Sequence, residues 1–182
     1  LAGARGIVFE AHSTDYQDEC SLRALVADRF AILKVGPALT FAYREALFGL
    51  EAIERELLGE RGVGLSGLRR ALDDAMREDP RYWAGFYSGD EEAARVQRAY
   101  SLSDRCRYYW RRPGVEAARR RLFANLEGRS IPRGLARQFL PEALERGGRP
   151  GQAVGDRIRR AFLPWARACR GAAPVAEGAE CP

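Results

Sequence analysis

The chain has 182 residues, of which 46% are hydrophobic and 30% are charged, and this ordinary globular composition excludes a fibrous or wholly disordered chain. No stretch approaches the roughly 20 consecutive apolar residues of a membrane span, and the first residues lack a secretory signal, so we expect a cytoplasmic protein without a membrane partner. The net charge of +5 comes from basic residues spread among 25 acidic ones, so no nucleic-acid partner is expected.

Two short apolar runs near the start predict neighbouring strands. Residues 7–11 and 30–35 are β-branched or aliphatic, and each run ends in turn residues, as buried parallel strands do. Between them, residues 15–29 have helical spacing, and Thr14 with Gln17 matches the capping box of a helix start. A right-handed crossover makes the strands parallel and adjacent, so their carboxyl ends open at the same edge of the sheet.

The rest of the chain predicts helices. Apolar residues recur at three- and four-residue steps from residue 40 to residue 58, before the glycine-rich sequence ERGVGLSG. Further helices are expected over residues 66–78, 80–87, 101–110, 113–126, 132–146 and 152–169. Residues 171–182 are small and polar, and we expect them to be disordered.

Two strands and many helices make an incomplete fold. A two-stranded parallel sheet has two unpaired edges and too little face to support a core. We therefore predict an α/β fragment in which residues 1–58 are the last two strand–helix units of a TIM (β/α)8 barrel. Residues 59–170 are then a mainly helical C-terminal extension, and the other strands lie upstream.

The strand ends carry the candidate catalytic and metal-binding residues. In a barrel, the loops after the strands converge on the active site. His12 is a candidate Zn²⁺ ligand there, or it simply hydrogen-bonds within the strand-end turn. Lys34 is a candidate for a Schiff base with a carbonyl substrate, and Glu10 for a catalytic base. The alternative is that Lys34 extends to solvent at the barrel mouth, or that it pairs with Glu10 across the two strands.

Polar residues in the same turns are candidates for binding a phosphate or another part of a substrate. Hydroxyls and backbone amides at a helix N-terminus suit an anion. The alternative is that they only form the turn and cap a helix. The candidate residues are Ser13, Thr14, Asp15, Gly36 and Thr40.

The sequence YSLSDRCRYYWRRP, residues 100–113, mixes aromatic residues with arginines, as nucleic-acid binders do. On a helix, however, Leu102, Cys106 and Tyr109 would share one face, so packing explains most of these aromatic residues. Arg105 and Arg107 remain able to hold an anion or a carboxylate of a partner.

Several long motifs, in the same order, resemble one bacterial family. They are FEAHSTDYQ, LRALVADRFAILKVGPALTFAYREALFGLEAIERELL, EDPRYWAGFY, YSLSDRCRYYW, IPRGLARQFLP and DRIRRAFLPWARAC. The family is the non-catalytic subunit of class II D-tagatose-1,6-bisphosphate aldolase, which is also labelled tagatose-6-phosphate kinase. No GxxxxGK[ST] loop or kinase signature supports the kinase label.

The resemblance implies a TIM barrel and a role in galactitol and N-acetylgalactosamine catabolism. It implies an accessory subunit that supports the activity and stability of a separate, zinc-dependent catalytic subunit, the expected partner. His12 falls where a catalytic aldolase has a zinc-ligand histidine. The phosphate loop after it is replaced by Ser13, Thr14 and Asp15, and Gly36 stands where a substrate-binding asparagine would be. The alternative that remains open is an active sugar-phosphate aldolase, using zinc on His12 or a Schiff base on Lys34.

Overall fold

The computed structural model describes residues 6–141 and 149–170, so the expected disorder of residues 171–182 lies outside the described residues. Within them the chain is mostly helical with one two-stranded sheet, which confirms the coarse α/β prediction. The elements in chain order are β1 (Phe9–Ala11), α1 (Glu19–Ala27), β2 (Phe30–Leu33), α2 (Pro37–Leu58), α3 (Leu68–Glu78), η1 (Pro80–Tyr82), α4 (Glu91–Tyr100), η2 (Arg105–Tyr108), α5 (Pro113–Leu126), α6 (Arg133–Phe139) and α7 (Pro150–Arg170).

The two strands are parallel neighbours, as predicted. Phe9 pairs with Phe30 and Ala11 with Leu33, so both strands end at the same edge of the sheet. The expectation that the strands are buried is wrong for this structure, because Phe9 is 45% and Ile32 46% exposed. Only two strands pair in the described part of the chain, and the helices that pack near them leave these side chains uncovered.

The predicted capping box of Thr14 and Gln17 is wrong, because helix α1 begins later, at Glu19. The carboxylate of Asp18 caps the helix by accepting the backbone N–H of Ser21 at 2.7 Å. Thr14 is buried instead, and its hydroxyl donates to the carbonyl of Lys34 at 3.0 Å. The same hydroxyl accepts the indole N–H of Trp165 at 2.8 Å. Thr14 therefore joins the end of the sheet to the C-terminal half of α7.

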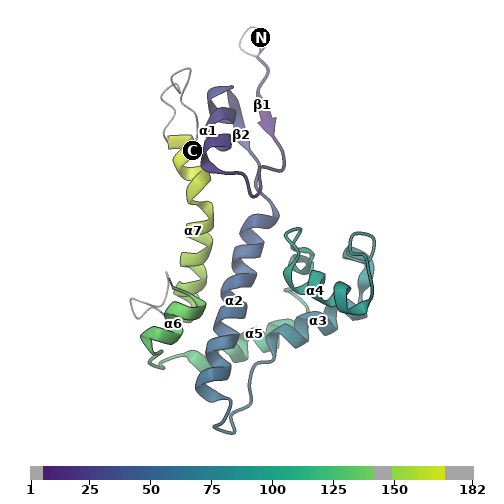
Figure 1. The fold of residues 1–182 in the computed structure, drawn as a ribbon, viewed down its shortest axis with the longest axis vertical. Helices are drawn as coiled ribbons and strands as arrows, with labels where there is room; N and C mark the ends of the chain where they lie inside the picture. Colours follow the sequence, from purple (N-terminus) through teal and green to yellow (C-terminus); the bar gives the residue numbers. More distant parts are fainter. Residues whose placement is uncertain (1–5, 142–148, 171–182) are drawn as a thin grey trace.

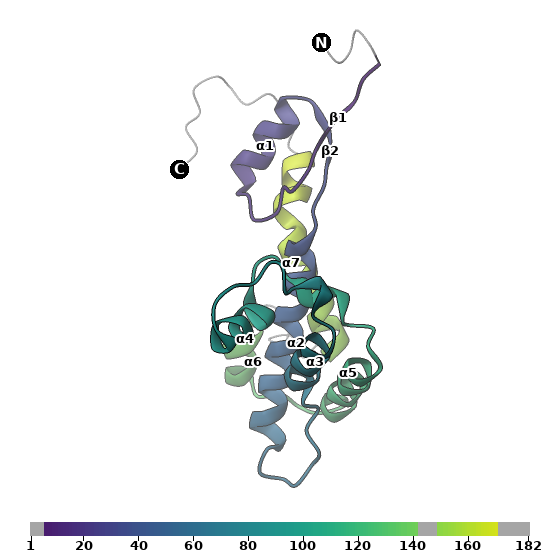
Figure 2. The ribbon, with the colours of Figure 1, turned by 90° about the vertical axis from the view of Figure 1, so that its right-hand side faces the viewer.

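Helices α2 and α7 run side by side below the sheet, and α7 also packs on α1 (Figure 1). Seen from the side, α3 to α6 lie around α2, below the sheet and α1 (Figure 2). The main core lies between these helices and includes Leu47, Leu50, Ile53, Leu72, Met76 and Leu122. None of the helices in residues 6–141 and 149–170 combines the length and apolarity that crossing a bilayer requires.

The helix predictions differ in their accuracy. Helix α5 spans the predicted residues 113–126, with Pro113 at its first turn. The helices predicted over 80–87 and 101–110 are wrong, because these segments contain only the short 3₁₀ helices η1 and η2. Leu102 is therefore exposed, while Cys106 and Tyr109 are buried.

Helix α4 was not predicted, although it has a clear start signal. The carboxylate of Asp90 accepts the N–H of Ala93 at 2.9 Å, and Glu91 and Glu92 occupy the first turn, where the helix dipole favours negative charge. Helix α6 ends at Phe139, and most of the predicted remainder to residue 146 lies outside the described residues.

Candidate functional site

The strand ends bring together three of the predicted site residues. One carboxylate oxygen of Glu10 lies 2.7 Å from the ammonium of Lys34 and 2.6 Å from Nε2 of His12. Glu10 belongs to β1, and the other two residues follow β1 and β2 directly, so parallel pairing places them side by side. The internal ion pair, which was one alternative from the sequence, is therefore formed.

This cluster is open to solvent. The hydrogen bonds from Lys34 and then from His12 lower the pKa of the Glu10 carboxyl, because both favour its ionised form. Both partners are solvent-exposed. A lysine that reacts as a nucleophile in a desolvated site needs the opposite surroundings.

The described residues do not provide a zinc site. A protein zinc site needs at least three ligands from the chain. Within residues 6–141 and 149–170, no group of three or more histidine, cysteine, aspartate and glutamate side chains is placed to hold a metal ion. At His12 the nearby carboxylate already holds the ammonium of Lys34, so a cation there would compete with that lysine.

The carboxylate of Asp15 accepts hydrogen bonds from the backbone amides at the start of α2 that a bound phosphate would need. One carboxylate oxygen accepts the N–H groups of Gly36 and Ala38, both at 2.9 Å. Because a carboxylate at a helix N-terminus satisfies free amides and interacts well with the helix dipole, Asp15 acts as a cap contributed from the neighbouring strand-end turn. A phosphate at this position would have to displace it.

The other predicted phosphate ligands differ in their availability. Thr14 uses its hydroxyl for Lys34 and Trp165, and Thr40 donates its hydroxyl to the carbonyl of Pro37 at 3.1 Å. Ser13 is exposed and has a φ of +56°, in the left-handed region. The phosphate-binding role of these residues stays a prediction.

The same turn also contacts the helical part of the molecule. Tyr16 donates its hydroxyl to the carbonyl of Leu102 at 2.6 Å, and its ring packs edge-on against Phe41 in α2. Burial, together with nearby carboxylates, raises the pKa of Tyr16 to about 12. The strand-end turn is therefore fixed to the segment between α4 and η2.

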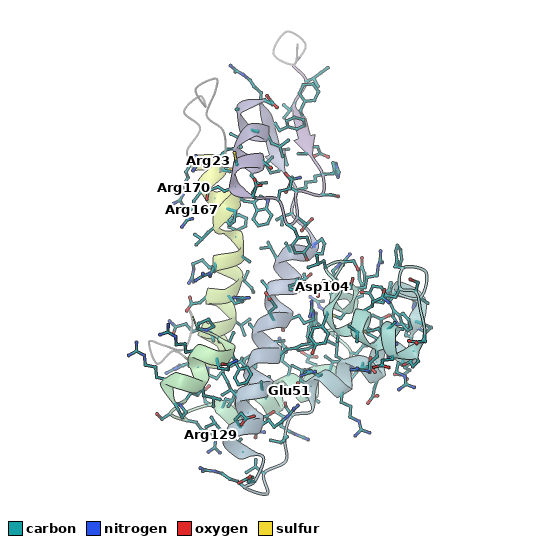
Figure 3. All side chains as sticks on the ribbon, viewed as in Figure 1. Arg23, Glu51, Asp104, Arg129, Arg167 and Arg170 are labelled. Atoms are coloured by element: carbon teal, nitrogen blue, oxygen red, sulfur yellow. The ribbon has the colours of Figure 1, made fainter. Side chains whose placement is uncertain are left out.

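Sequence reasoning missed a buried ion pair beside this contact. Nε of Arg44 lies 2.7 Å from the carboxylate of Asp104, and both side chains are buried. The guanidinium of Arg44 also lies over the ring of Phe41, 4.1 Å from its centroid. Figure 3 shows Asp104 where the lobe formed by α3, η1, α4 and η2 meets α2. No local signal in the sequence indicates this pair, because Asp104 lies inside the predicted helix 101–110 and Arg44 is 60 positions away.

A cavity of about 360 Å³ lies between α2, α3, the end of α4, α6 and α7. Its lining arginines all have carboxylate partners: Arg44 pairs with Asp104, Arg157 lies 3.0 Å from Glu45, and Arg69 lies 3.9 Å from Glu51. None of the strand-end residues described above lines this cavity, so it is separate from the predicted site.

Comparison with known proteins identifies the family. Residues 1–170 match the family model for the D-tagatose-1,6-bisphosphate aldolase subunit GatZ/KbaZ-like. The structure is also similar to the crystal structure of a probable tagatose 6 phosphate kinase from Sinorhizobium meliloti 1021, with a TM-score of 0.82 and 43% sequence identity. That match covers 93% of this chain and 45% of the other, so this chain spans less than half the length of that protein. The chain belongs to the D-tagatose-1,6-bisphosphate aldolase subunit GatZ/KbaZ-like family.

Proposed function

We propose that this chain is part of an accessory subunit of class II tagatose-bisphosphate aldolase. In this role it supports the activity and stability of a separate, zinc-dependent catalytic subunit that cleaves tagatose 1,6-bisphosphate. The pathway would be galactitol or N-acetylgalactosamine catabolism. The family match over residues 1–170 supports an aldolase subunit, and the accessory role is the proposal.

The arrangement at the strand ends is the observation that carries the accessory role. The only histidine of the sequence is bonded to Glu10, and Glu10 is paired with Lys34. The amides at the start of α2 are held by Asp15. His12, Lys34 and the amides at the start of α2 are thus each bonded to another residue of this chain. Such internal pairing stabilises the strand-end turns and opposes the use of Lys34 as a nucleophile or of His12 as a metal ligand.

We also propose that β1, α1, β2 and α2 are the last two strand–helix units of a TIM barrel. The parallel pairing of neighbouring strands with helical crossovers supports this, as do the exposed side chains of Phe9 and Ile32, which further strands would cover. Helix α2 ends at Leu58, where the sequence placed the start of the helical extension. Helix α7 then returns to pack on α1 and α2, so the two regions share a packing surface.

The accessory role is tested by reconstitution. The full-length protein is co-expressed with the tagged catalytic subunit, and cleavage of tagatose 1,6-bisphosphate is measured for the catalytic subunit alone and for the mixture. We expect co-purification and a gain in turnover on mixing. We expect the His12→Ala variant to keep that gain, because the accessory role does not require His12 to bind a metal ion. Absence of both co-purification and gain would end the proposal.

The alternative is that the protein is itself an aldolase. If Lys34 forms a Schiff base, borohydride in the presence of substrate attaches substrate covalently to the isolated protein, and Lys34→Ala abolishes the labelling. If His12 holds a catalytic zinc ion, the isolated protein cleaves substrate and His12→Ala loses that activity. We expect neither result, since Lys34 is paired with Glu10 and the described residues offer no third metal ligand.

A further inference from the structure

An exposed group of aromatic side chains lies on the lobe formed by α3, η1, α4 and η2, which extends to one side of α2 (Figure 1). Phe86 is 62%, Tyr108 46% and Tyr82 37% exposed. The rings of Tyr82 and Tyr108 stack with their centroids 4.8 Å apart. Large rings gathered on a surface mark interaction sites more often than isolated exposed apolar residues do.

Two arginines hold these rings in place. The guanidinium of Arg105 lies over the ring of Phe86 and donates to the carbonyl of Tyr82 at 2.9 Å. The guanidinium of Arg107 lies 4.5 Å from the ring centroid of Tyr108 and donates to its hydroxyl at 2.8 Å. We call Tyr82, Phe86, Arg105, Arg107 and Tyr108 the aromatic–arginine face.

The face carries positive charge that the described residues leave uncompensated. The hydrogen bonds of Arg105 and Arg107 go to carbonyl and hydroxyl oxygens, which are neutral. Beside the face, the single carboxylate of Asp79 serves both Arg81 and Arg112. Because Arg105 and Arg107 bond only neutral oxygens, and Arg81 and Arg112 share one carboxylate, the surface that complements this face is acidic.

The ring contacts favour a protein over a single-stranded nucleic acid. Base stacking needs a free ring face. Here the ring of Tyr82 contacts both the ring of Tyr108 and the guanidinium of Arg81. Tyr108 is likewise contacted by Arg107, and Phe86 by Arg105. What remains exposed is a surface of phenylalanine, tyrosine and arginine side chains. Tyrosine and arginine are enriched at the energetic centres of protein interfaces.

We propose that the aromatic–arginine face is the docking surface for an acidic patch of the catalytic aldolase subunit. This inference rests on the proposed accessory function. Stacked rings and held guanidinium groups lose little conformational freedom on binding, so the face is preorganised for its partner. Carboxylates of the partner would pair with Arg105 and Arg107, and the exposed ring edges would be covered.

The test measures the affinity of the full-length protein for the immobilised catalytic subunit. The Phe86→Ala/Tyr108→Ala double variant and the Arg107→Gln variant remove parts of the face. Phe162→Ala on α7, whose ring is 43% exposed, and Arg120→Gln on α5 are matched controls outside the face. We expect Kd to rise about tenfold or more for the double variant and to change less than about twofold for the controls. Added salt should weaken the binding of Arg107→Gln less than that of the wild type.

The outcomes distinguish a failure of the docking surface from a failure of the proposed accessory function. If the wild type binds and activates the catalytic subunit while the face variants bind as the controls do, the docking surface is overturned and the accessory function stands. If the wild type does not bind, the accessory function fails. Circular dichroism spectra and the Tm of each variant, measured without the catalytic subunit, show whether a loss of binding reflects unfolding.

Other occupants of the face would also overturn the proposal, and each has its own result. A homodimer that the double variant dissociates in sedimentation would assign the face to a second copy of the chain. Hydrogen-exchange protection of residues 82–86 and 105–108 in the full-length protein alone would assign it to another part of the same chain. Single-stranded RNA binding at low salt that the double variant abolishes would assign it to nucleic acid.

Discussion

Replacing Asp104 with asparagine is expected to destabilise the protein by about 3 kcal/mol, because it leaves the guanidinium of Arg44 charged and uncompensated in the interior. The two side chains are 2% and 0% exposed and 2.7 Å apart, so water does not take over the role of the lost charge. The value is at the low end of the usual range of about 3–5 kcal/mol because the amide oxygen still accepts from Arg44. Asparagine also tolerates the backbone φ of +46° at this position.

The assay is thermal and urea unfolding followed by tryptophan fluorescence. For a chain of this size, about 3 kcal/mol corresponds to a fall in Tm of roughly 6–12 °C. Asp74→Asn is the matched control, since its partner Arg70 is 3.7 Å away and both side chains are exposed, and it should cost less than about 1 kcal/mol.

A double-mutant cycle gives the refuting result. In the Arg44→Met background the buried charge is absent, so adding Asp104→Asn should cost far less than it does in the wild type. If Asp104→Asn costs the same free energy in both backgrounds, the two charges do not stabilise each other and the reasoning is wrong.

Three further predictions concern α2 and the strand ends. A Cβ at Gly49 would lie 2.9 Å from the backbone oxygen of Phe139, the last residue of α6. The Gly49→Ala variant should therefore lower the free energy of unfolding in urea by about 1–3 kcal/mol. Gly155 has open space around it, so Gly155→Ala is the control and should be neutral or stabilising. Asp15→Ala should cost about 1 kcal/mol through the lost cap of α2, and the prediction fails if amide exchange in the first turn of that helix is unchanged. The pKa of Glu10 is lowered in the folded protein, so its ionised form contributes stability that is lost as the pH falls through that lowered pKa. The Lys34→Gln variant should raise the pKa of Glu10, which carbon-detected NMR can follow. An unchanged titration of Glu10 in this variant would contradict the role of the lysine.

The proximity of the strand-end residues could be predicted from the parallel pairing of the two strands. Once residues 7–11 and 30–35 are parallel neighbours, side chains that follow them must meet at one edge, and Glu10, His12 and Lys34 do so. Which of them pair internally was left open, because proximity alone does not distinguish an ion pair from a reactive lysine.

The sequence alone determined the strand–helix–strand order and helix α5, because periodicity and a proline at a helix start act between residues a few positions apart. Tertiary structure decided the partners that lie far apart in the chain. Trp165 bonds Thr14 across 151 positions, and Arg44 pairs with Asp104 across 60. Such contacts depend on how completed helices pack against one another, and helical or strand spacing within one segment carries no information about the segment it will meet.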